Sequence, residues 1–164
     1  MVFNPISHEV IPQAIADTSA TQKLPLGRII TAEDPTYGVG EFIYLLGVGS
    51  TVVGSIVNYD DSFQTALDSS AVSGPSRPLA IAMSANVASQ YGWYQISGMA
   101  VATKSNAVSF ADGAGLGAGS GLAVAVATGT VIQGAIVAAV ASAKSDVTTV
   151  LLCINRPHDP SDVS

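Results

Sequence analysis

The stretch Arg77–Ala102, RPLAIAMSANVASQYGWYQISGMAVA, decides the fold class of this chain. Its first part, Leu79–Met83, alternates larger apolar residues with alanine, a period of two that is typical of a strand with one more deeply buried face. The part Tyr94–Met99 alternates in the same way. Between them, Asn86–Gly92 contains turn-forming residues and ends on a glycine. The pattern predicts two strands and a connection, a hairpin-like unit at the centre of the core.

The same stretch holds an aromatic group, Tyr91, Trp93 and Tyr94, which includes the only tryptophan of the chain. Large aromatic side chains fill protein cores and interfaces between subunits, and when exposed they can stack against a ligand. Packing in the core or at a subunit interface is the favoured interpretation, and a ligand-stacking platform is the alternative.

Outside this stretch, runs of β-branched and apolar residues predict further strands. They cover Leu26–Ala32, Glu41–Leu46, Thr51–Asn58, Ala107–Phe110, Leu122–Ala127, Val131–Ala143 and Val147–Ile154. The alanine-rich Val131–Ala143 also permits a helix, but partial alternation favours a strand. The segment GVGS predicts a tight connection before Thr51–Asn58, and Asp60–Ser76 predicts a long loop. About nine short strands with glycine- and proline-rich turns predict an all-β sandwich or barrel.

We expect the chain to divide into an extended N-terminal arm over residues 1–25 and a single β-rich domain over residues 26–164. Three prolines interrupt the arm, and no strand or helix period continues there for more than a few residues. At the other end, Pro157 is expected to stop the fold soon after the last strand. Within that strand, Cys153 stands in the apolar run VLLCI and is expected to be a buried free thiol.

Charged residues make up only 11% of the chain, against about 25% in typical soluble domains. A free monomer usually covers its surface with charged side chains, so the shortage predicts a subunit of a close-packed assembly. The net charge of −6, with only six Lys and Arg residues, argues against nucleic acid and anionic membranes as partners. The uncharged stretch Gly113–Ala143 is long enough to span a bilayer, but its repeated glycines favour turns between strands.

Residues that carry catalysis are scarce and scattered. The two histidines, His8 and His158, lie near opposite ends of the chain, and no metal-ligand spacing surrounds them. The glycine-rich residues 112–121 complete neither a GxGxxG nor a Walker pattern. A two-carboxylate glycosidase is the remaining enzymatic alternative, but the glutamates are few and all lie early in the chain. The sequence therefore predicts no enzyme, no cofactor and no metal site.

Two phrases of the chain resemble small structural proteins from the virions of tailed bacteriophages. They are GEFIYLLGVGSTVVGSIVNYDD (Gly40–Asp61) and GPSRPLAIAMSANVASQYGWYQISGMAVA (Gly74–Ala102), and they cover roughly the middle half of the chain. The most similar role is that of a capsid decoration, or cement, protein. A tail, neck or fibre-associated subunit is the alternative within that class, and a carbohydrate-binding β module is the alternative outside it.

The resemblance implies a β-rich subunit that binds the outer surface of the phage head as a homotrimer and ties neighbouring capsomers together. Its partners would be the major capsid protein and sister copies, and it would be assembled into the virion in the host cytoplasm. The family has no catalytic residues, so none are assigned. From composition, the residues expected to contact the capsid or a sister subunit are Phe3, Pro5, Ile6, Val10 and Ile11 in the arm, with Tyr91, Trp93 and Tyr94.

Overall fold

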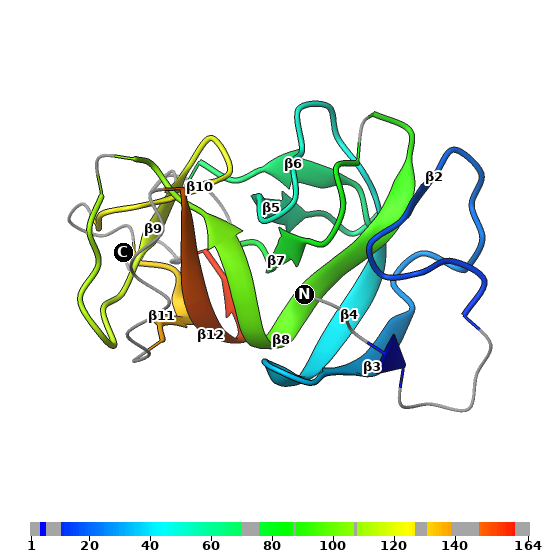
Figure 1. Ribbon diagram of the computed structural model, residues 1–164. Coiled ribbons are helices and arrows are strands. Elements are labelled where there is room, and N and C mark those ends of the chain that lie inside the picture. The colour runs from blue at the N-terminus through cyan, green and yellow to red at the C-terminus, as the bar shows by residue number, and fades with distance from the viewer. Residues whose placement is uncertain are drawn as a thin grey trace.

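The computed structural model describes residues 4–5, 11–69, 76–86, 88–106, 108–126, 131–138 and 148–159, and these form strands and loops without a helix (Figure 1). The strands are β1 (Asn4–Pro5), β2 (Thr18–Ser19), β3 (Ile29–Asp34), β4 (Gly38–Leu46), β5 (Ile56–Tyr59), β6 (Thr65–Leu67), β7 (Leu79–Ala82), β8 (Tyr91–Thr103), β9 (Gly117–Gly119), β10 (Leu122–Val124), β11 (Gln133–Val137) and β12 (Thr149–His158). The predicted all-β class is confirmed.

The longest strand, β8, organises the main sheet. Its first half, Tyr91–Ser97, pairs antiparallel with β4, and its second half, Ser97–Thr103, pairs antiparallel with β12. Figure 1 shows β8 running from the upper right to the bottom centre and then turning upward beside β12, with β3 and β4 on one side and β11 and β12 on the other. Among the described residues, ten strands join this sheet, while β9 and β10 form a separate pair. β8 therefore joins two parts of the sheet, one with β3 and β4 and the other with β11 and β12. This arrangement fits a β-sandwich.

The change of partners occurs at Ser97, and the next residue is Gly98, whose φ is 98°. A Cβ atom at this position would lie 2.5 Å from the carbonyl oxygen of Val39 in β4. Only glycine combines this backbone conformation with so close an approach of a neighbouring strand. The residue therefore lets β8 bend between its two partners.

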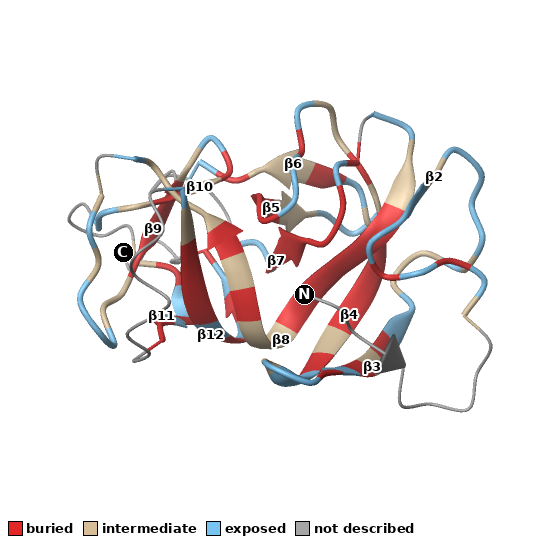
Figure 2. Ribbon diagram, viewed as in Figure 1, coloured by how far each residue is buried: buried red, intermediate tan, exposed pale blue. Residues whose placement is uncertain are grey.

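Both faces of the Phe42–Leu45 part of β4 and of the Gly92–Ile96 part of β8 are buried (Figure 2). One face contributes Phe42, Tyr44 and Trp93 to a cluster that also contains Ile15 from the N-terminal segment. The opposite face contributes residues to a second cluster, Ile43, Leu45, Tyr94 and Ile96 among them. A third cluster lies under the second half of β8 and β12 and includes Ala100, Ala102, Val150, Leu152 and Ile154. The period-2 alternation thus places residues into different clusters rather than into core and solvent.

The central hairpin-like unit is present, because β7 and β8 pair antiparallel through Ile81 opposite Gln95 and Ala82 opposite Tyr94. All four residues of β7 are buried. The expected single deeply buried face is therefore wrong for this strand. The cause is its position between two hydrophobic clusters, with Leu79 and Ile81 in one and Ala80 and Ala82 in the other.

Three local predictions differ from the structure. The tight connection after β4 does not make a hairpin with β5, because β4 pairs with β3 and β8 while β5 pairs with β6 and β7. The predicted loop Asp60–Ser76 contains β6, and residues 108–110 of the predicted strand Ala107–Phe110 form none. Short apolar runs show that a strand forms but do not specify its partner.

The last strand continues past the residue that was expected to stop it. β12 includes Pro157, and it is paired with β11, whose register shifts between Gln133 and Ala135. A proline is tolerated in a strand at such a bulge, because its missing N–H removes no regular ladder bond there. The expectation that the fold ends before Pro157 is therefore wrong.

The longer described part of the predicted arm packs against the rest of the chain. Residues 11–25 are mostly irregular, as expected, but Ile15 is buried in the Trp93 cluster, and β2 pairs with the start of β8. This segment folds back onto the sheet of the same chain. Residues 1–3 and 6–10 lie outside the described part of the chain.

Candidate functional site

The aromatic group predicted as an interface occupies the interior. Trp93 and Tyr94 have 0% exposed surface, and Tyr91 is half-buried. The ring of Tyr44 lies 5.0 Å from that of Trp93, tilted by 59°, and 6.3 Å from that of Tyr91, stacked at 15°. Trp93 and Tyr94 are therefore core residues out of reach of a partner, which corrects their assignment to an interface. The same burial excludes these two rings as a stacking platform.

A buried glutamine fastens the N-terminal segment over these rings. The Tyr44 hydroxyl donates a 2.7 Å hydrogen bond to the Gln13 Oε1 atom, and Gln13 Nε2 donates to the Tyr91 carbonyl oxygen at 2.9 Å. The Trp93 indole N–H donates to the Gln13 carbonyl oxygen at 3.0 Å. Every polar group in this set finds a partner, so the segment is tied to its own β4 and β8.

The arm residues predicted to contact the capsid are only partly described. Phe3, Ile6 and Val10 lie outside the described residues. Pro5 belongs to β1, which pairs with β3 through Ala32, and Ile11 is half-buried against the Trp93 cluster. Their contact with a partner remains a prediction.

The structure brings together an exposed apolar surface that the sequence interpretation missed. Ile136 of β11 stands opposite Cys153 of β12, which stands opposite Met99 of β8, so the three side chains form one row across the sheet. Ile136 is 49% exposed, Cys153 is exposed and Met99 is half-buried. Val101, two residues after Met99, is half-buried on the same face. We call Met99, Val101, Ile136 and Cys153 the apolar row.

The apolar row corrects the expected burial of Cys153. The two neighbours of Cys153, Leu152 and Ile154, point into the third cluster, so the thiol points to the opposite face. The run VLLCI is apolar at both its odd and its even positions, which indicates a strand with two apolar faces rather than one. That signal was present in the sequence.

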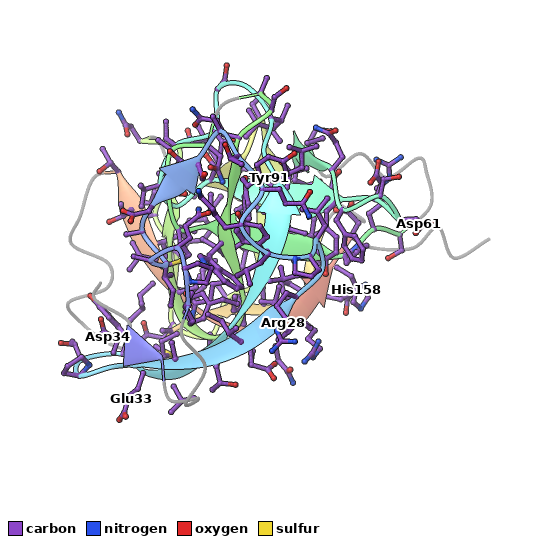
Figure 3. The ribbon with its side chains drawn as sticks, turned by 90° about the vertical axis from the view of Figure 1, so that its right-hand side faces the viewer. Arg28, Glu33, Asp34, Asp61, Tyr91 and His158 are labelled. Atoms are coloured by element: carbon purple, nitrogen blue, oxygen red, sulfur yellow. The ribbon has the colours of Figure 1, made fainter. Side chains whose placement is uncertain are left out.

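A second surface feature is a pocket of about 370 Å³ where β5, β7 and the end of β12 meet. Tyr59, Ser76, Arg77, Arg156 and His158 contribute its polar lining, and Leu79, Ile96 and Pro157 contribute apolar lining. Figure 3 shows the His158 side chain near the periphery of the molecule. The Arg156 guanidinium forms a 2.9 Å ion pair with Glu41. Glu41 of β4 lies opposite Ser97 of β8, and Asn155, the residue before Arg156 in β12, also lies opposite Ser97.

Beside this pocket lies a carboxyl group in an unfavourable setting. Asp159 is 9% exposed, and its Oδ1 atom has no hydrogen-bond partner. Burial and the neighbouring carboxylate of Asp68 raise the pKa of Asp159 to about 6, although Arg77 and His158 oppose the rise. The last described residue of the chain therefore changes charge close to neutral pH.

Among the described residues, no three His, Cys, Asp or Glu side chains are grouped so that they could hold a metal ion. No helix in the described part of the chain is long and apolar enough to cross a membrane. Comparison of the chain with protein families, curated proteins and solved structures finds no match.

Proposed function

We propose that this chain is a capsid decoration protein, which binds the outer surface of a tailed-phage head and bridges neighbouring capsomers. Its partners are the major capsid protein and sister copies in a homotrimer, and its place in the virion is the head surface. The role is structural and involves no catalysis. The proposal begins from the two phrases that resemble virion proteins and from the low charge of the chain.

The observation that carries the proposal is the apolar row. Its four residues lie on the face of a rigid, strand-paired scaffold and carry no charge. Exposed contiguous apolar side chains are typical of surfaces that another protein covers. Because the opposite face of the same strands is fully used by the core cluster, the row is free to serve as a contact without opening the fold.

A tail or neck subunit would use the same surface features, and binding to heads distinguishes it. A carbohydrate-binding module with the three aromatic residues as its platform is disfavoured, because Trp93 and Tyr94 are fully buried. Tyr91 alone is half-buried and offers too little surface for a stacking platform.

The test is light scattering of the purified protein, followed by co-sedimentation with phage heads that lack it. We expect a trimer that binds expanded heads and raises their resistance to heat. A stable monomer that does not sediment with heads would refute the proposal and favour the tail.

The contact surface is tested in the same assay with Ile136→Glu, which places a charge at the most exposed aliphatic side chain of the row. Val39→Glu is the matched control, because Val39 is a similarly exposed aliphatic residue on β4, outside the row. We expect Ile136→Glu to abolish trimer formation or head binding, and Val39→Glu to retain both. Far-ultraviolet circular dichroism confirms that both variants are folded.

A further inference from the structure

The pocket between β5, β7 and β12 gathers positive charge in an acidic chain. The net charge is −6, yet Arg77, Arg156 and His158 line one pocket. The other Lys and Arg residues in the described part of the chain are Lys23, Arg28 and Lys104, none of which lines it. The pocket thus concentrates two of these five cations and one of the two histidines.

The chemistry of the lining is that of an oxyanion site. Guanidinium groups donate several hydrogen bonds in a fixed fork that matches the oxygens of carboxylate and phosphate. Tyr59 and Ser76 also line the pocket, and the Ser76 hydroxyl donates to the Asp159 carbonyl oxygen at 2.6 Å. Burial raises the pKa of Tyr59, and the positive charge of Arg156 partly opposes this rise. Polar side chains from three separate segments therefore line one space.

A carboxylate of the chain, Glu41, already pairs with one of these cations, Arg156. Glu41 accepts from Arg156 at 2.9 Å, and both side chains remain partly accessible, Glu41 at 34% and Arg156 at 57%. Exposed ion pairs of this kind contribute little to stability. An incoming anion can therefore replace Glu41 as the partner of Arg156 without disturbing the core.

We propose that this pocket binds an oxyanion, a carboxylate or a phosphate, held between Arg77 and Arg156. The apolar side chains of Leu79, Ile96 and Pro157 accommodate the carbon skeleton of the ligand. The inference does not depend on a role in the phage head, because it rests on the pocket alone. The anion is supplied either by a free small molecule or by an acidic side chain of a protein.

The test is a titration of the isotope-labelled full chain, followed by amide chemical shifts in NMR spectra. The probes are inorganic phosphate, citrate and a short glutamate-rich peptide, each compared with sodium chloride at the same ionic strength. We expect saturable shifts at Arg77, Arg156 and His158. Saturation by phosphate or citrate identifies a free anion as the source, and saturation by the peptide alone identifies a protein carboxylate.

Variants test the mechanism in both directions. Arg77→Gln is expected to weaken binding about tenfold, the factor for loss of one charge-assisted contact of modest strength. Glu41→Gln removes the competitor and is expected to tighten binding, whereas Lys104→Gln, outside the pocket, leaves it unchanged. The proposal is overturned if no probe produces saturable shifts, if sodium chloride reproduces them, or if Arg77→Gln binds as well as the natural chain.

Discussion

Replacement of Gly98 by alanine tests the organisation of the main sheet around β8. At a φ of 98°, any residue with a Cβ atom is strained, at a cost of about 1–3 kcal/mol. The new Cβ atom would also lie 2.5 Å from the Val39 carbonyl oxygen, so β4 must shift. Overpacking of this kind costs about 1–3 kcal/mol more. We therefore expect Gly98→Ala to lower the free energy of unfolding by about 4 kcal/mol, the middle of the summed range.

Two other glycines separate the contributions. Gly38 has a φ of 76°, but no atom lies within 4 Å of the place that an added Cβ would take, so Gly38→Ala should lose only the backbone part, about 1–2 kcal/mol. Gly49 has neither a positive φ nor a neighbour within 4 Å, so Gly49→Ala should be neutral or stabilise by up to about 1 kcal/mol.

The assay is urea denaturation followed by the fluorescence of Trp93, the only tryptophan, which is fully buried when the chain is folded. The expected order of unfolding free energies is Gly49→Ala at or above the natural chain, then Gly38→Ala, then Gly98→Ala. A Gly98→Ala variant within about 1 kcal/mol of the natural chain would show that β8 does not need glycine to change partners.

The N-terminal segment and the carboxyl group at the end of β12 give two further predictions. Gln13→Ala leaves the buried Tyr44 hydroxyl without its 2.7 Å acceptor, so we expect the free energy of unfolding to fall by about 1–3 kcal/mol and tryptic cleavage after Lys23 to become faster. The control Gln22→Ala, at an exposed residue, should change neither quantity. Equal cleavage rates for the two variants would contradict the attachment of the N-terminal segment through Gln13. Asp159 keeps its proton in the folded state up to a pKa of about 6, against 3.8 when unfolded, so stability falls as pH rises from about 4 to 6, by at most about 3 kcal/mol. Asp159→Asn should abolish this fall in thermal melts, and exposed Asp17→Asn should retain it; a fall that persists in Asp159→Asn would assign the titration to another group.

The fold class followed from the sequence because a period of two is a local property. The runs now seen as β4, β7 and β8 were all expected as strands. Which of these strands pair with each other could not be predicted from the same local pattern. The connection after β4 looks like a hairpin turn locally, but β8 provides a longer antiparallel partner, and β5 pairs elsewhere. Which strands pair depends on the burial that each arrangement achieves across the whole sheet.

The fate of the N-terminal segment shows a second limit. Prolines and irregular spacing indicated an arm, yet a single polar residue, Gln13, ties this segment to two tyrosines and a tryptophan. Such a network depends on residues about 30 and 80 positions away and leaves no periodic trace in the sequence. Sequence reasoning left both the core and an interface open for Trp93 and named it among the interface residues, whereas the segment that covers it belongs to the same chain.

The exposed thiol of Cys153 allows the most direct test of the apolar row as the contact surface. We would measure its alkylation rate in the free subunit and in heads carrying the bound protein, with Val39→Cys/Cys153→Ser as a reference outside the row. Burial of the row predicts that Cys153 is strongly protected on heads while Cys at position 39 still reacts. Equal alkylation of Cys153 in free and bound protein would contradict the apolar row as the surface by which this chain assembles.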